Sequence, residues 1–233
     1  MKYNILGDDD CPLLHIDLCE GERVLIERGS MAYMSNVSLS GKMNSEKKGF
    51  AGFISAVGRS IASGESVFIT EATGDCDGAE LGVAPSIPGK IVPLEIGARQ
   101  YCLNTGAFLA CDASVTYNII TQSFGKALLG GTGGLFIMET AGTGDMLVNA
   151  FGDILEIEVR PDKPMIIDNE HVVAWDSSLE YNIEVASGTF GFTTGEGFVN
   201  RFTGSGKVLI QTRNTHSLAE EIRKFIPTQS SNS

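Results

Sequence analysis

Apolar and polar residues alternate with a period of two over much of the chain. The clearest stretches are Val115–Ile119, Leu155–Val159 and Leu179–Ile183. Such alternation places one face of a strand against a core and the other face in water. Glycines stand at the ends of blocks that recur along the chain, at positions that suit hairpins needing a positive φ: Gly74, Gly142, Gly144, Gly204 and Gly206. The pattern therefore predicts an all-β protein made of antiparallel sheets.

Helical spacing of apolar residues is clear only near the C-terminus. Leu218, Ile222, Phe225 and Ile226 are spaced to share one face of a helix. Thr215 or Ser217 can cap the start of this helix, and Pro227 ends it. We therefore expect a helix over residues 217–227, followed by a polar frayed tail over residues 228–233.

The sequence also repeats itself. Residues 110–119 read A-C-D-A-S-V-T-Y-N-I, and residues 174–183, 64 positions later, read A-W-D-S-S-L-E-Y-N-I, with six of ten positions identical. A second match, at an offset of 62, relates Phe136–Gly144 to Phe198–Gly206. Asp112 and Asp176 fall at equivalent positions, which favours a shared structural task such as side-chain hydrogen bonds to backbone.

The first part of the chain carries fainter copies of both blocks. Val67–Gly74 matches Leu135–Gly142, and Gly29–Ser35 (G-S-M-A-Y-M-S) matches Gly106–Asp112 (G-A-F-L-A-C-D). We interpret residues 1–216 as one compact domain of three repeats, about 1–96, 97–160 and 161–216. Each repeat alone would leave apolar surface uncovered, so a pseudo-threefold arrangement of three packed units is expected.

Composition narrows the classes of partner. The 17 Lys and Arg against 29 Asp and Glu give a formal net charge of −12. Nucleic acid is not expected as a partner, because non-specific affinity for it comes from cationic side chains. The five cysteines form no C-x-x-C pair, and neither a secretory signal nor a run long enough to span a membrane is present. These features indicate a cytoplasmic protein whose cysteines act as small core hydrophobes.

Four motifs identify a resemblance. They are the glycine-rich run Lys47–Gly64, G-E-S-V-F at Gly64–Phe68, G-G-L-F at Gly133–Phe136 and G-E-G-F-V at Gly195–Val199. The chain resembles, over about residues 10–215, the altered-inheritance-of-mitochondria family, which includes bacterial proteins of unknown function. The resemblance implies three tandem antiparallel β-sandwich repeats, a fold likened to the tryptophan-dependent RNA-binding attenuation protein (TRAP-like). It implies no catalytic residue set, and the acidic charge argues against RNA binding.

Motifs that could hold an anion or a metal are better explained as turns. Gly130–Gly134 (G-G-T-G-G) precedes a strand instead of a helix, which is the reverse of a phosphate loop. Asp75 and Asp77 lack the further ligands of a calcium loop, and the acidic run Asp8–Asp10 is interpreted as solvated. No catalytic, cofactor or metal residues are therefore assigned.

An apolar, glycine-containing segment, Lys47–Ser66, is the strongest candidate for function. Its apolar residues share one helical face, and a shorter relative occurs at Phe124–Leu129 before the glycine cluster. These loops can cover sheet ends, meet another subunit or, least favoured, rest on a membrane surface. The predicted interaction residues are Phe50, Phe53, Ile54, Val57, Phe124, Leu128 and Leu129.

The sequence is compatible with two functions. The first is a non-enzymatic β-scaffold, a homo-oligomer or a partner-binding protein, that associates through the two glycine-rich loops. The second is a small-molecule-binding protein or enzyme with a cleft between repeats near His171, drawing on Glu170, Asp112 and Asp176. His171 at a strand entry can also be a structural histidine, and as a base it would need a nucleophile nearby.

Overall fold

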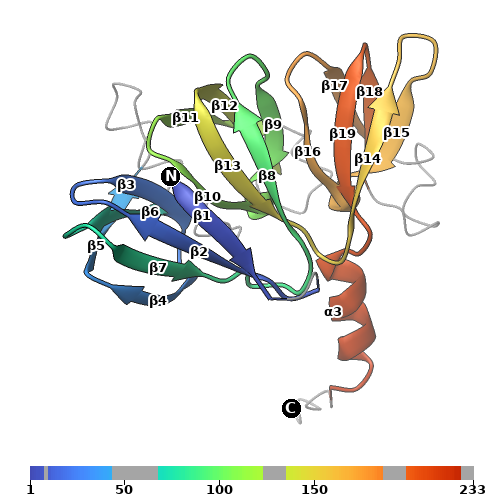
Figure 1. Cartoon of the computed structure of the whole chain (residues 1–233). Coiled ribbons are helices and arrows are strands. Elements are labelled where there is room, and N and C mark those ends of the chain that lie inside the picture. The colour runs from blue at the N-terminus through green and yellow to red at the C-terminus, as the bar shows by residue number, and fades with distance from the viewer. Residues whose placement is uncertain (8–9, 44–67, 123–134, 186–197, 227–233) are drawn as a thin grey trace, which may run out of the picture.

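The chain folds into three β-sandwich units that follow one another in sequence (Figure 1). The computed structural model describes residues 1–7, 10–43, 68–122, 135–185 and 198–226. The first unit contains β1 (Lys2–Leu6), β2 (Leu13–Leu18), β3 (Arg23–Glu27), β4 (Met31–Ser35), β5 (Val37–Met43), β6 (Phe68–Gly74) and β7 (Ala79–Val83). The second contains β8 (Ile91–Ile96), β9 (Tyr101–Asn104), β10 (Phe108–Asp112), β11 (Val115–Gln122), β12 (Leu135–Gly142) and β13 (Gly144–Asn149). The third contains β14 (Ile154–Val159), β15 (Met165–Asp168), β16 (Val172–Asp176), β17 (Glu180–Val185), β18 (Phe198–Thr203) and β19 (Gly206–Gln211).

Two short 3-10 turns and one helix complete the described elements. The turns, η1 (Thr105–Ala107) and η2 (Asn169–His171), connect β9 to β10 and β15 to β16. The helix α3 (Thr215–Arg223) follows the last strand and points away from the sheets (Figure 1).

Neighbouring units share a sheet. The strand orders are β1-β2-β7-β4, β5-β6-β3-β10-β13-β8, β11-β12-β9-β16-β19-β14 and β15-β18-β17. Each six-stranded sheet therefore takes three strands from one unit and three from the next, joined at β3–β10 and at β9–β16. Because the sheets run through the junctions, hydrogen bonds as well as packing hold successive units together.

The pairing of strands recurs from unit to unit, residue by residue. Each of β4, β10 and β16 carries a β-bulge after its first residue, opposite β7, β13 and β19 respectively. This register makes Tyr33, Ala110 and Ala174 equivalent, and it makes Met34, Cys111 and Trp175 equivalent. The same comparison makes Leu25, Cys102 and Ile166 equivalent in β3, β9 and β15.

Apolar side chains from both faces of the shared sheets form the cores. Leu14, Ile16 and Leu81 lie in the core of the first unit, Leu103 and Met146 in that of the second. In the third unit Trp175 packs edge-on against Tyr181 and Phe202, with ring centroids 5.0 and 5.6 Å away. The expected all-β class of antiparallel sandwich repeats with one C-terminal helix is confirmed.

Boundaries differ from the sequence-based ones. Because β8 pairs with β13 and β14 with β19, the second and third units begin near Ile91 and Ile154, a few residues before the expected 97 and 161. The helix starts earlier than 217, and its cap is Asn214, whose side chain accepts a hydrogen bond from the Ser217 backbone N–H at 2.7 Å. Thr215 and Ser217 thus lie inside the helix.

Glycine serves the hairpins in two ways. Gly142, Gly144 and Gly204 have positive φ angles of 82°, 138° and 106°, as expected. Gly74 and Gly206 do not, so the expectation is wrong for these two. A Cβ at Gly74 would stand 2.4 Å from the Cys19 carbonyl oxygen, so glycine is needed there for the close approach of two chain segments.

Candidate functional site

The first unit ends at a strand with an open edge. Among the described residues, β4 pairs with β7 alone, whereas its equivalents β10 and β16 are paired on both sides. The second partner of β10 is β3 of the preceding unit, and that of β16 is β9. Within the described residues no strand pairs with the outer side of β4.

The side chains of β4 are exposed where their equivalents are buried. Met34 is 46% exposed, whereas Cys111 is 0% and Trp175 is 1% exposed. Tyr33 is 40% exposed, in contrast to the fully buried Ala110 and Ala174. The difference follows from the missing neighbour, since the local backbone and its bulge are the same in all three strands.

A complementary open edge lies in the third unit. In the described chain β15 pairs with β18 only, whereas its equivalents β3 and β9 also pair with the following unit. Ile166 on β15 is 57% exposed, against 7% for Leu25 and 6% for Cys102 at the equivalent positions. Figure 1 shows β4 and β15 in the first and third units, at opposite ends of the row of units.

Both edges have the chemistry of interfaces. The residues of β4 are M-A-Y-M-S and those of β15 are M-I-I-D, so the two strands together carry a single charge, on Asp168. Proteins usually protect a free edge with charged residues, proline or a covering segment, because an apolar free edge pairs readily with other strands. These two edges, with Met31–Ser35 and Met165–Asp168, form the candidate functional site.

Tyr33 is held across the face of its sheet. Gly82 on β7 pairs with both Tyr33 on β4 and His15 on β2. A Cβ at Gly82 would lie 2.2 Å from the Tyr33 ring, so glycine lets the ring cross the middle strand. The Tyr33 hydroxyl reaches His15 Nδ1 at 2.6 Å, and His15 Nε2 lies 3.2 Å from Asp17 Oδ1. His15 is therefore engaged in contacts within the sheet.

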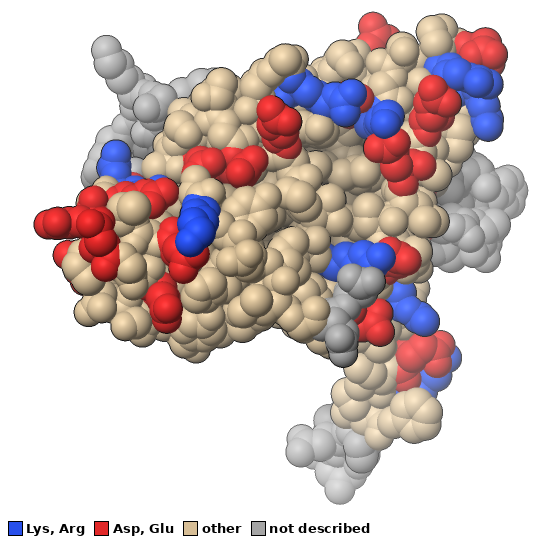
Figure 2. Space-filling model, viewed as in Figure 1, with Lys and Arg blue, Asp and Glu red and all other residues tan. Residues whose placement is uncertain are grey.

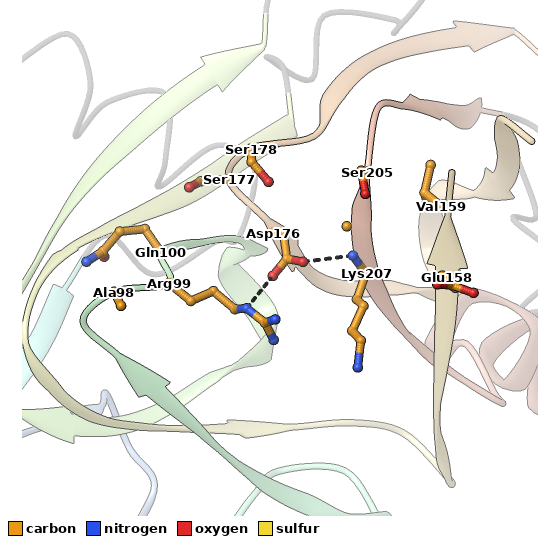
Figure 3. A pocket seen from close by; sticks show the side chains of 11 residues that line it. Ala98, Arg99, Gln100, Glu158, Val159, Asp176, Ser177, Ser178, Ser205 and Lys207 are labelled. Carbon is orange, nitrogen blue, oxygen red and sulfur yellow. Dashed lines mark hydrogen bonds and ion pairs between the residues drawn. The ribbon is translucent and has the colours of Figure 1, made fainter. Parts of the chain in front are cut away.

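A polar cavity of about 480 Å³ lies at the junction of the second and third units (Figure 3). Asp176 Oδ2 accepts a hydrogen bond from the Lys207 backbone N–H at 2.8 Å, and Arg99 Nε lies 3.3 Å from Asp176 Oδ1. The Lys207 ammonium pairs with Glu156 at 2.6 Å. Arg99, Asp176 and Lys207, which line this cavity, are thus each engaged in a contact within the chain.

Asp112 makes the equivalent bond in the second unit. Its Oδ2 accepts from the Asp145 backbone N–H at 2.7 Å, and its Oδ1 contacts the amino nitrogen of Met1. Asp145 and Lys207 are the equivalent second residues of β13 and β19. The expectation that both aspartates bond to backbone is confirmed, and each one holds the turn before the last strand of its unit.

His171 also has structural partners. Its Nδ1 lies 2.7 Å from the Gln211 carbonyl oxygen, which can only accept, so this nitrogen carries the proton. The Asn214 side-chain amide then donates to Nε2 at 3.1 Å. His171 thus connects the third unit to the cap of α3. Neighbouring Glu170 lines a cleft of about 220 Å³, and burial raises the pKa of its carboxyl.

The acidic pair Asp75 and Asp77 makes hydrogen bonds at a turn. Asp75 Oδ1 accepts from the Ser38 hydroxyl at 2.7 Å and Asp77 Oδ1 from the Glu20 backbone N–H at 3.0 Å, so both serve the turn between β6 and β7. In the described ranges no three His, Cys, Asp or Glu side chains gather in a metal-binding geometry.

The five cysteines differ in burial, and Cys76 is partly buried. Cys102 and Cys111 are buried as expected, and burial raises the pKa of the Cys102 thiol to about 11 and that of Cys111 further. Cys11 and Cys19, in contrast, are exposed, so the expectation that all five are core residues is wrong. Both lie in connections at the ends of β2, where neighbouring strands do not cover them.

The predicted interaction loops fall outside the described residues. This applies to Phe50, Phe53, Ile54, Val57, Phe124, Leu128 and Leu129. By connectivity the first loop joins β5 to β6 and the second joins β11 to β12, which are equivalent hairpins. Their role in association stays a prediction.

Sequence reasoning assigned no role to β4 or β15. A signal was present, because the faint match of Gly29–Ser35 to Gly106–Asp112 is the alignment of β4 with β10 that the register shows. What the match alone does not reveal is that β10 has a second neighbouring strand, whereas β4 has one neighbour among the described strands.

Charges do not gather into a basic patch on the face shown in Figure 2. Blue atoms stand beside red ones, and red atoms gather over the first unit. The helices of the described chain are too short or too polar to cross a lipid bilayer.

Comparison with known proteins agrees with this fold. Residues 3–213 match the model of the family described as Mitochondrial biogenesis AIM24. An uncharacterized protein of Streptococcus pyogenes serotype M6 is 45% identical over 232 residues, which cover 99% of this chain and 93% of that protein. The X-ray crystal structure of a Streptococcus pyogenes protein, a structural genomics target, has a TM-score of 0.79 at 41% identity, covering 97% of this chain and 99% of that one. The chain therefore belongs to the AIM24 family.

Proposed function

We propose that this protein is a self-associating β-scaffold that works by joining chains through the open edges of its end units. The observation that carries the proposal is the exposure of Met34 and Ile166 at positions that are buried in every internal junction. An open edge offers main-chain hydrogen bonds to another strand, and exposed apolar side chains beside it supply affinity. The glycine-rich loops over residues 47–66 and 124–134 are proposed as additional contacts.

Burial of the apolar side chains beside these edges favours association. Fully burying a Met, Ile or Tyr-sized side chain contributes about 1.5–3 kcal/mol, and Met34, Tyr33 and Ile166 are each about half exposed. Main-chain pairing removes the unsatisfied edge at the same time.

The experiment compares the solution mass of three proteins by light scattering and native mass spectrometry. The unmodified chain is expected at multiples of 24.8 kDa, and the Met34→Lys/Ile166→Lys double variant at 24.8 kDa. The control is Leu155→Lys, because Leu155 on β14 is 49% exposed but lies on neither edge, and this variant is expected to keep the unmodified mass. Since all three positions are exposed, the substitutions leave the cores intact.

Two results would overturn the proposal. One is an unmodified chain that stays at the monomer mass at every concentration reached. The other is a double variant that associates as well as the Leu155→Lys control.

A thermal-shift screen of nucleotides, metals and amino acids examines the cleft beside Glu170, where a specific ligand would raise the melting temperature.

A further inference from the structure

We infer that copies of this chain join head to tail, with β4 of one copy pairing antiparallel to β15 of the next in the register Tyr33–Ile167, Met34–Ile166 and Ser35–Met165. The inference rests on the proposed self-association and specifies its geometry. It makes the contact between copies a third example of the junction that the chain already contains twice.

The register follows from the two internal junctions. At the first, Ala110 pairs with Ile26, Cys111 with Leu25 and Asp112 with Val24. At the second, Ala174 pairs with Leu103, Trp175 with Cys102 and Asp176 with Tyr101. The two sets coincide when the units are superposed by their bulges. Carrying the same alignment onto β4 and β15 gives one register without any free choice.

The direction in which side chains face supports this pairing. Leu25 and Cys111 both lie in the core of the second unit, while Cys102 and Trp175 both lie in that of the third. At each junction, therefore, a side chain of the earlier unit is part of the core of the following unit. Among the described strands β15 pairs only with β18, so no following unit lies beside Ile166, and the first unit of another copy, beside Met34, would supply one.

The two edges also suit each other in length and polarity. Both strands are short. Their paired positions place Ile167 beside Tyr33 and Ile166 beside Met34, and no like charges face each other. Pairing would join β15-β18-β17 to β4-β7-β2-β1 as one continuous sheet, just as the other sheets continue through their junctions. Two copies of β4 would instead bring together edges that are never paired with their own equivalents inside the chain.

A head-to-tail contact is heterologous, because it uses different surfaces on the two copies. In an open assembly only the two terminal copies keep an unused edge, β4 at one end and β15 at the other. Growth continues until a ring closes, so assemblies larger than a dimer are expected. A self-complementary contact between like edges would stop at two copies.

A complementation experiment separates these geometries. Met34→Lys blocks only the β4 edge and Ile166→Lys blocks only the β15 edge, so each variant alone is expected to stay at the monomer mass. An equal mixture retains one working pair of edges and is expected to give dimers of twice 24.8 kDa and nothing larger. Leu155→Lys mixed with either variant serves as the control for unspecific effects of a new charge.

Cysteine pairs then test the register. In a background with Cys11, Cys19 and Cys76 changed to serine, Met34→Cys and Ile166→Cys chains are oxidised separately and together. Residues directly opposite in antiparallel strands have Cβ atoms about 4.5–5.5 Å apart, close enough for a disulfide after small adjustments. We expect a covalent dimer in the mixture, and none from either variant alone or from Met34→Cys mixed with Leu155→Cys.

Each outcome has a definite meaning. Dimers of Met34→Cys alone, or a Met34→Lys variant that still dimerises, would show like-edge pairing and overturn the head-to-tail inference while self-association stands. Assembly without the cross-link would overturn the register. A monomeric unmodified chain would overturn the proposed function itself.

Discussion

Asp112 and Asp176 show what a single carboxylate does at each junction. Asp176 is almost fully buried, with its Oδ2 on the Lys207 backbone N–H and its Oδ1 facing Arg99. The bond fixes the turn between β18 and β19, and the ion pair reaches the loop before β9 in the preceding unit. One residue therefore couples a turn in its own unit to the neighbouring unit.

Replacing Asp176 with alanine should lower the free energy of unfolding by about 2 kcal/mol. The reason is that a backbone N–H loses its acceptor and a buried site loses its charge partner, which costs about 1–3 kcal/mol. Urea denaturation followed by tryptophan fluorescence measures the change, because Trp175 is adjacent and buried. Asp162→Ala is the matched control: this carboxylate is 78% exposed beside Arg160, and its loss should be nearly neutral. Equal stability of both variants would refute the structural role.

The α3 helix illustrates what an element contributes apart from the body of the protein. None of its residues is buried, and Leu218 and Ile222 remain 42% and 50% exposed. A helix of this length is marginal in water by itself, so its ends matter more than its packing. Asn214 provides both the cap and, through His171, the attachment to β19.

Asn214→Ala should unravel α3 without unfolding the sheets. Loss of an N-cap costs about 1 kcal/mol, which is a large fraction of the stability of an isolated short helix. We expect faster amide hydrogen exchange over residues 215–223 and an unchanged melting temperature of the β units. Asn214→Ser keeps a capping oxygen and should retain most of the protection. If both variants exchange alike, the cap is not what holds the helix.

At the scale of the whole molecule, the connections between units touch each other. Gly89, before β8, bridges to Gly152, before β14, and the Lys90 backbone N–H donates to the Gly152 carbonyl at 3.1 Å. The Ala150 N–H donates to the Lys90 carbonyl at 3.0 Å. The two linkers therefore brace the arrangement of three units, in addition to the shared sheets.

Gly89→Ala should be among the most damaging substitutions in the linkers of this protein, because Gly89 is buried. Its φ is 150°, and a Cβ would stand 1.9 Å from the Ala150 carbonyl oxygen, where no flexible side chain can yield. We expect a loss of more than about 3 kcal/mol in stability, or separate melting of the first unit, by calorimetry. Gly97→Ala is the control, since a Cβ there meets nothing within 4 Å. A Gly89→Ala melting curve that matches the control curve would show that the linkers do not brace the units.

Much of the architecture could be predicted from local patterns. The alternation at Val115–Ile119 and Leu155–Val159 is found in β11 and β14, and the helical spacing after residue 215 is found in α3. These predictions succeed because side-chain periodicity reports on one strand or helix at a time. The unit boundaries were less accurate because they depend on pairing between strands far apart in sequence, such as β8 with β13.

The candidate site was not predicted, for a similar reason. Met34 and Ile166 are unremarkable apolar residues in short strands, and their equivalents Cys111 and Leu25 are buried. Nothing in a local stretch distinguishes an apolar residue with a neighbouring strand from one without. The aspartate bonds were predictable because Asp112 and Asp176 recur at the same position in a turn.

By itself, the sequence determined the class of fold, its strands and terminal helix, and the similarity between segments of the chain. These properties follow from short-range periodicity and from the match of the sequence with itself. Only the tertiary structure decided which strands lie beside which, and therefore which edges are left open at the two ends. The physical reason is that a strand edge is satisfied by hydrogen bonds to a neighbour that can come from anywhere in the chain.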